Sequence, residues 1–84
     1  MNKKTLLAKA LSSPNNLHFN ELVSLAEAFG FVLSRSEGSH RIFALPSTTH
    51  RLNLQNCKGK AKPYQIRQLL KLVEENNLRL EDDE

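Results

Sequence analysis

Two segments of this chain repeat one apolar spacing, and that repeat limits the folds available to it. The first segment carries Leu22, Leu25, Ala26 and Phe29. The second carries Ile66, Leu69, Leu70 and Val73. Side chains at positions i, i+3, i+4 and i+7 share one face of an α-helix. The spacing therefore predicts two amphipathic helices, over residues 20–29 and 63–75, and each must bury its apolar face.

The residues at the ends of these segments support the helix boundaries. Gly30 follows the first stripe, where a helix C-terminus favours a residue that tolerates a positive φ. Pro63 opens the second helix at the position proline prefers. A third, shorter stripe predicts another amphipathic helix over residues 2–11. The sequence leaves open whether this helix packs on the domain or mediates association.

The segment between the two main helices has the alternation of strands rather than of helices. Aromatic and branched residues predict strands over residues 31–33, 41–45 and 50–54, with turns at 37–39 and 46–49. Short connections make consecutive strands antiparallel neighbours. Both main helices must then cover one face of the sheet, because no other apolar surface is available. The predicted fold is a two-layer α+β domain whose other sheet face is open to solvent or a partner.

Length and composition narrow the class of protein further. The 84 residues fit one domain, divided into an N-terminal helical extension (1–17), a core (18–78) and an acidic tail (79–84). The formal charge of +3 suits an acidic partner such as RNA. A single cysteine, Cys57, precludes an internal disulfide. With no long apolar run and no visible signal peptide, we expect a soluble cytoplasmic protein without a membrane partner.

One short stretch combines groups suited to phosphodiester chemistry. The turn Gly38-Ser39 delivers His40 and Arg41 onto the start of a predicted strand. A neutral imidazole, with an ordinary pKa near 6.5, can remove the proton from a ribose 2′-hydroxyl. The residues expected to contact phosphate or RNA are Ser39, Arg41, Arg51, Lys58, Lys60, Lys62 and Arg67.

The remaining parts of such a site are less defined by the sequence. An acid for the leaving oxygen would be His50, Lys58 or Lys60. The lysines at 58, 60 and 62 would point the same way if their loop were extended, and they would otherwise be a solvated polar loop. The three histidines are too scattered for a metal motif, so we expect neither a metal site nor a cofactor.

Three local motifs give the chain a resemblance to a known family. They are the helix end Leu25-Ala26-Glu27-Ala28-Phe29-Gly30-Phe31, the turn Gly38-Ser39-His40 followed by Ile42-Phe43, and the segment from Lys62 to Leu70. Over residues 20–78 the chain resembles the HicA family of bacterial toxins, which are small mRNA interferases. Many relatives have a second histidine where Arg41 stands here.

The resemblance implies a fold like that of a double-stranded-RNA-binding domain and cleavage of mRNA by His40. It also implies neutralisation by a HicB antitoxin. Two other functions fit the same residues: an RNA-binding module without catalysis, and a protein-interaction module in which the basic loop is incidental.

Overall fold

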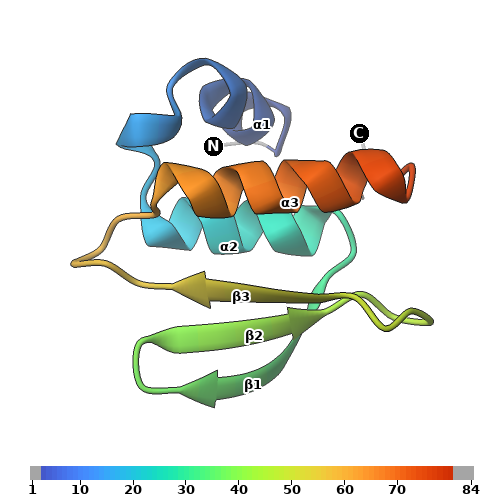
Figure 1. Cartoon of the computed structure of the whole chain (residues 1–84). Coiled ribbons are helices and arrows are strands. Elements are labelled where there is room, and N and C mark those ends of the chain that lie inside the picture. The colour runs from blue at the N-terminus through green and yellow to red at the C-terminus, as the bar shows by residue number, and fades with distance from the viewer. Residues whose placement is uncertain (1–2, 81–84) are drawn as a thin grey trace.

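The computed structural model describes residues 3–80, and its elements follow the predicted order (Figure 1). The elements are α1 (Lys3–Ser12), the 3₁₀ turn η1 (Pro14–Asn16), α2 (Phe19–Ala28), β1 (Val32–Glu37), β2 (His40–Ala44), β3 (Arg51–Gln55) and α3 (Pro63–Glu75). The predicted limits of α3 are confirmed. Asn2, predicted to begin the first helix, and the tail residues 81–84 lie outside the described part of the chain.

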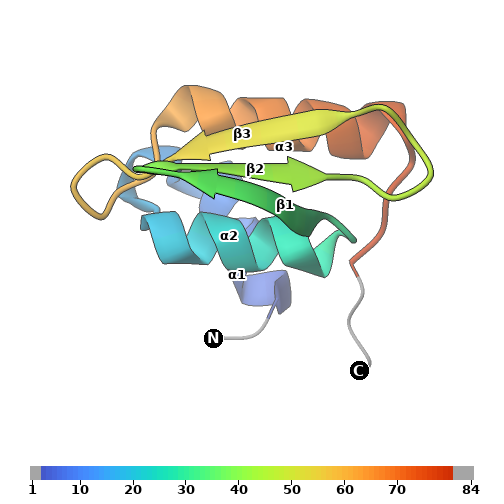
Figure 2. The same ribbon diagram turned by 90° about the horizontal axis from the view of Figure 1, so that it is seen from below.

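The strands form one antiparallel sheet in the order β1-β2-β3. Helices α2 and α3 lie side by side across one face of the sheet, and the other face has no covering element among the described residues (Figures 1 and 2). The predicted two-layer α+β arrangement is therefore confirmed. The short helix α1 lies against the helix layer, on the side away from the sheet (Figure 1).

The core lies between the helices and the sheet. From the helix layer it takes the predicted stripes, and from β3 it takes Leu52 and Leu54, which are 2% and 0% exposed. Phe43 of β2 is also buried. Burying each such side chain stabilises the fold by about 1.5–3 kcal/mol. The apolar periodicity of the sequence thus determines which sheet face is covered.

Strand β1 is longer than predicted, because it runs to Glu37 rather than ending at Leu33. Its second half is polar and exposed, so it carries no apolar alternation. Backbone pairing with β2 makes this segment a strand, and the register is irregular between Leu33 and Arg35. Helix α2, β2 and β3 each begin and end one residue away from their predicted limits. Differences of this size are typical of element ends.

Helix α1 packs on the domain, which answers the question that the sequence left open. Leu6 and Ala10 are buried in the common core. Lys9 Nζ lies 3.0 Å from Glu21 Oε1 on α2, and the same carboxylate accepts the backbone N–H of His18 at 2.9 Å. The N–H of His18, with a smaller contribution from Lys9, lowers the pKa of Glu21, against the opposing effect of burial. An ion pair and an apolar contact together join α1 to α2.

Candidate functional site

His40 begins β2 immediately after a two-residue turn. Gly38, the first residue of that turn, has φ +59°, a conformation that L side chains rarely adopt. In the sheet, His40 lies between Glu37 of β1 and Gln55 of β3. Its side chain is half-buried rather than fully exposed. The turn and the two flanking strands therefore fix the backbone that carries the imidazole.

The side chain of His40 meets Asn53 on the open face of the sheet. Successive residues of a strand point to opposite faces, and Leu52 and Leu54 of β3 are buried under the helices. Asn53 must then point to the open face, where its Oδ1 lies 3.2 Å from His40 Nδ1. An amide oxygen only accepts, so in a neutral ring this contact corresponds to the tautomer with hydrogen on Nδ1, in which the lone pair of Nε2 is free. This arrangement leaves a ring nitrogen able to accept a proton.

Arg41 points to the other face of the same strand, with Phe43. Its guanidinium carbon lies 5.5 Å from the centroid of the Phe19 ring, at the start of α2. That distance is within the range of a cation–π contact, which holds the arginine on the helix side. His40 and Arg41 are adjacent in sequence but do not converge on one point in space.

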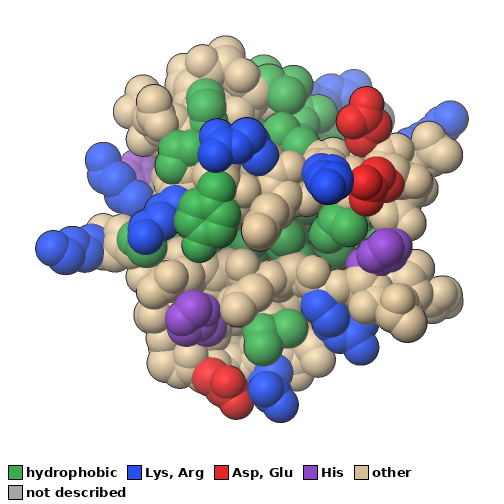
Figure 3. All heavy atoms as spheres, in the orientation of Figure 1, with side chains coloured by type: hydrophobic (Ala, Val, Ile, Leu, Met, Phe, Trp, Pro, Cys, Tyr) green, Lys and Arg blue, Asp and Glu red, His purple; other side chains and the backbone are tan. Residues whose placement is uncertain are grey.

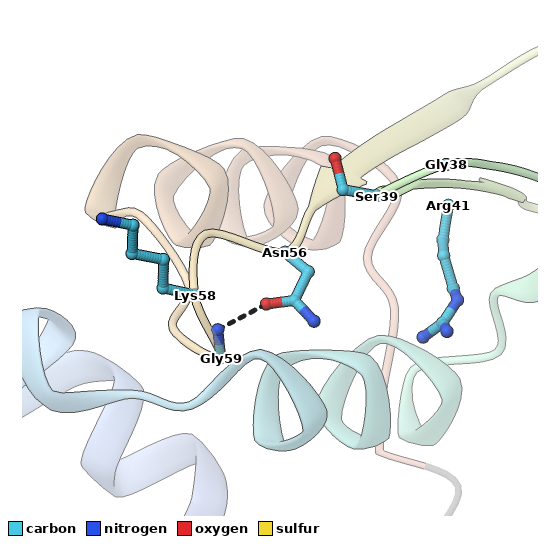
Figure 4. A pocket seen from close by; sticks show the side chains of 6 residues that line it. All are labelled: Gly38, Ser39, Arg41, Asn56, Lys58 and Gly59. Atoms are coloured by element: carbon cyan, nitrogen blue, oxygen red, sulfur yellow. Dashed lines mark hydrogen bonds between the residues drawn. The ribbon is translucent and has the colours of Figure 1, made fainter.

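A shallow pocket of about 280 Å³ lies on the side of Arg41. It is lined by Gly38, Ser39, Arg41, Asn56, Lys58 and Gly59 (Figure 4). In Figure 4 the Arg41 side chain reaches down toward α2, whereas Lys58 extends away from the other side chains. The pocket brings three residues of the predicted phosphate-binding set, Ser39, Arg41 and Lys58, to one place.

The loop between β3 and α3 is not extended, which excludes the aligned row of lysines, one of the two alternatives that the sequence left open. Cys57 and Lys60 exchange backbone hydrogen bonds of 3.0 and 3.1 Å. Lys58 and Gly59 between them have φ of 55° and 85°, as in a tight turn. Asn56 Oδ1 also accepts the Gly59 N–H at 2.6 Å. Because the chain reverses here, the lysines at 58, 60 and 62 do not form one row.

Backbone hydrogen bonds fasten this loop to its neighbours. The N–H of Phe19 donates to the Gly59 carbonyl at 2.9 Å, and the N–H of Ala61 donates to the Leu17 carbonyl at 3.1 Å. On the other side, the N–H of Asn56 donates to the Ser39 carbonyl at 2.9 Å. Basic side chains gather at this end of the molecule in Figure 3, over the β3–α3 loop. The loop is therefore a fixed cationic corner beside the Gly38-Ser39 turn.

Other predicted residues lie away from His40. His50 is opposite Leu45, at the far end of the β2–β3 pair, about 15 Å or more along the strands. It is therefore too distant to act as the acid paired with His40. Arg51 lies next to His50, where its side chain donates to the His50 carbonyl at 3.0 Å. Arg67 is exposed on α3 and Lys62 immediately precedes that helix.

The polar partner of His40 was absent from the predicted site. Asn53 carries no motif, and its contact with His40 joins residues 13 apart in sequence. The cross-strand register creates this contact, and alternation along β3 was the only signal that pointed to it. Within residues 3–80, no group of three or more His, Cys, Asp or Glu side chains has a geometry that would hold a metal ion.

Comparison with known families identifies the chain. The model of HicA toxins of bacterial toxin-antitoxin systems matches residues 19–74, about two thirds of the 84 residues. The chain belongs to the HicA family of toxins. The match begins at the first residue of α2 and ends in the last turn of α3, so it includes the whole sheet of this HicA toxin and leaves α1 outside. No match was found among curated proteins or among solved structures.

Membership gives this HicA chain its general role. It is the toxin of a toxin-antitoxin system, and it has an antitoxin as its partner. Within residues 3–80, none of the helices is both long and apolar enough to cross a membrane.

Proposed function

We propose that this HicA toxin is an endoribonuclease that cleaves mRNA, with His40 as its general base and without need of a metal ion. The observation that carries the proposal is the contact between His40 Nδ1 and Asn53 Oδ1 on the open face of the sheet. In the neutral Nδ1–H tautomer, this contact orients the ring and leaves Nε2 free to take a proton. Family membership supports a toxic activity, and the half-buried imidazole supplies the chemistry for one.

The proposed reaction begins at the ribose 2′-hydroxyl. Nε2 of His40 removes the hydroxyl proton, and the oxygen attacks the adjacent phosphorus. A bond between O2′ and phosphorus forms, the bond from phosphorus to O5′ breaks, and the leaving oxygen takes up a proton from water. The products are a 2′,3′-cyclic phosphate and a 5′-hydroxyl end. DNA lacks the 2′-hydroxyl, so the mechanism requires RNA.

The cationic corner is the proposed binding site for the RNA backbone. Arg41 and the loop lysines Lys58 and Lys60 contact phosphates, and Ser39 donates from the turn. Because Arg41 lies on the helix side of β2 and His40 on the open side, the strand of RNA passes over the Gly38-Ser39 turn. Lys62, Arg67 and Arg51 extend this footprint on either side.

The proposed partner is a HicB-like antitoxin that neutralises the toxin by covering His40 and the basic residues. A small basic domain with an open sheet face offers such a protein both a flat surface and complementary charge.

The test compares purified wild-type toxin with two histidine variants on one RNA oligonucleotide. His40→Ala should reduce the cleavage rate by about 10²–10⁴-fold, which is the usual contribution of a general base. His50→Ala is the matched control, because it removes a half-buried histidine from the residue that precedes β3 and should cleave normally. Mass spectrometry of the wild-type products should find cyclic phosphate ends.

A substrate with 2′-deoxyribose throughout should remain uncut by all three proteins. Cleavage of that substrate, or normal activity of His40→Ala, would show that the proposed mechanism is wrong. Salt-sensitive RNA binding with no cleavage by the wild type would instead favour an RNA-binding module without catalysis.

A further inference from the structure

The outer edge of β3 offers unpaired backbone groups. At the two ends of the β2–β3 pair, the N–H of Leu45 donates to the His50 carbonyl and the N–H of Asn56 donates to the Ser39 carbonyl. Hydrogen-bonded pairs alternate along an antiparallel ladder, so the odd-numbered residues of β2 and the even-numbered residues of β3 form them. The backbone groups of Arg51, Asn53 and Gln55 therefore point away from β2. The N–H of Gln55 is satisfied by the Gln65 side chain of α3, at 3.3 Å. The N–H and C=O groups of Arg51 and Asn53 remain at the edge.

These groups face a groove between β3 and α3. The groove has a volume of about 380 Å³ and is lined by Arg51, Leu52, Asn53, Gln68, Lys71, Leu72 and Glu75. Helix α3 lies beside β3 in both views of the ribbon (Figures 1 and 2). A strand edge beside a helix is a geometry that accepts an extended peptide as an additional strand. Leu52 and Leu72 give the groove an apolar floor.

The chemistry of the edge favours a polypeptide over RNA. Donors and acceptors alternate along β3, and an extended backbone pairs with both kinds. RNA phosphates only accept, so they would leave the carbonyls of Arg51 and Asn53 buried without partners, at a cost in free energy. Two of the three charged lining residues, Arg51 and Lys71, are cations. The charge therefore suits a strand that carries acidic side chains.

The opposite edge of the sheet is protected. Strand β1 has an irregular register between Leu33 and Arg35, and Arg35 and Glu37 form an ion pair of 3.3 Å along it. Bulges and charges are features that discourage pairing at a sheet edge. The register of β2 with β3 is regular, and β3 carries one charged side chain, Arg51, with no ion pair along the strand among the described residues. The two edges of the sheet are therefore not equivalent.

We propose that the antitoxin docks an extended, acidic segment onto β3 as a fourth strand, in the groove against α3. The segment pairs with the backbone of Arg51 and Asn53. The docked strand is separated from β2 by β3, at about 10 Å, so access to His40 is hindered by the side chains that the strand carries on the open face beside Asn53. The docking needs only the antitoxin partnership of the family, whereas its effect on His40 rests on the proposed function.

Amide hydrogen exchange measured by NMR tests the docking directly. The probe is the cognate antitoxin, purified and added to the full-length toxin in excess. The amides of Arg51 and Asn53 should exchange quickly in the free toxin and be strongly protected in the complex. The amides of Leu52 and Leu54, which already pair with β2, serve as internal references that are protected in both states.

Substitution at the edge gives a second, independent readout. Arg51→Pro removes the edge N–H at the first residue of β3, a position where proline is tolerated. Arg51→Ala removes the cation and its hydrogen bond to the His50 carbonyl but keeps the backbone N–H. The proline variant should bind the antitoxin about tenfold more weakly than the alanine variant, as expected for one lost hydrogen bond at a buried site. Ser36→Pro makes the same change at the outer edge of β1 and should bind normally. Thermal unfolding checks that all three variants are folded.

Several results would overturn the proposal. One is continued fast exchange of Arg51 and Asn53 in the complex, and another is equal affinity of Arg51→Pro and Arg51→Ala. Protection of these amides in the free toxin at high concentration, with a dimeric mass, would assign the edge to a second copy. Protection by an RNA with 2′-deoxyribose at its cleavage sites, but not by the antitoxin, would assign it to nucleic acid. None of these measurements depends on RNA cleavage. The docking proposal and the nuclease proposal can therefore fail independently of each other.

Discussion

The two faces of the sheet are built from the same strands but differ in how far their side chains are buried. On β2, Phe43 is 1% exposed under the helices, whereas its neighbours Ile42 and Ala44 are only partly covered on the open face. His40 and Asn53 meet on that open face. Alternation along the strand thus places a buried core residue and the proposed catalytic residue within the same short segment, on opposite faces. Stability and activity should respond to different substitutions, even at positions next to each other.

The largest effect is expected from the covered face. Phe43→Ala should lower the free energy of unfolding by about 3–5 kcal/mol, because it leaves a cavity in the core. Ile42→Ala, the matched change on the open face, should cost much less because that side chain is already partly exposed. Urea denaturation of both variants measures the difference. An equal loss of unfolding free energy in the two variants would show that the two faces do not differ in their contribution to stability.

An exchange of the two residues that follow the turn tests the open face. The double variant His40→Arg, Arg41→His keeps the composition but moves the imidazole to the helix side of β2. Its cleavage of RNA should be as slow as that of His40→Ala, about 10²–10⁴-fold below wild type. Initial rates on one RNA oligonucleotide measure this. Wild-type activity in the exchanged protein would show that the face of the histidine does not matter.

A smaller effect is expected from the residue that holds the ring. Asn53→Leu removes the acceptor for Nδ1, so the imidazole loses its orientation, and kcat should fall about tenfold with little change in KM. Asn53→Asp keeps an acceptor at that position and should restore part of the rate. Nitrogen chemical shifts of the His40 ring should report the Nδ1–H tautomer in the wild type and a different tautomer mixture in Asn53→Leu. Identical ring shifts in the two proteins would remove Asn53 from the site.

The smallest effect is expected in the helix layer, where a charge rather than apolar packing makes the contact. Glu21→Gln should destabilise the protein by about 1 kcal/mol at pH 7, comparable to loss of a helix cap. The folded-state pKa of Glu21 is lowered, so its contribution is present above the ordinary glutamate pKa of about 4.3 and is lost as the pH falls through the folded value. Urea unfolding at pH 7 and at pH 3 should show the difference shrink. A constant difference would mean that the carboxylate is not responsible.

Apolar spacing was sufficient to predict most of the fold. The stripes of α2 and α3 fixed both helices and the covered face, and Gly30, with φ 102°, ends α2 as expected. The second half of β1 escaped prediction because its polar residues are held by pairing with β2 rather than by burial. The composition of a short segment does not reveal whether it pairs with another strand.

The candidate site was less predictable than the fold. The Gly38-Ser39 turn identified His40, because turn residues and a strand start are local signals. Asn53 could not be found without the register of β2 and β3. The shape of the lysine loop depends on positive φ values at Lys58 and Gly59 and on bonds to the start of α2. Contacts between distant segments decide these features, so they become visible only in the folded chain.

The position of α3 in the chain has a consequence for the synthesis of the toxin. His40, Asn53 and the loop lysines Lys58 and Lys60 lie between residues 38 and 60, but Ile66 and Leu69 of α3 complete the core beneath them. A nascent chain that has emerged only as far as the β3–α3 loop contains the β2–β3 hairpin with His40, but it lacks the apolar side chains of α3. Because the core is incomplete without these side chains, we expect the nascent chain to be harmless until α3 has emerged.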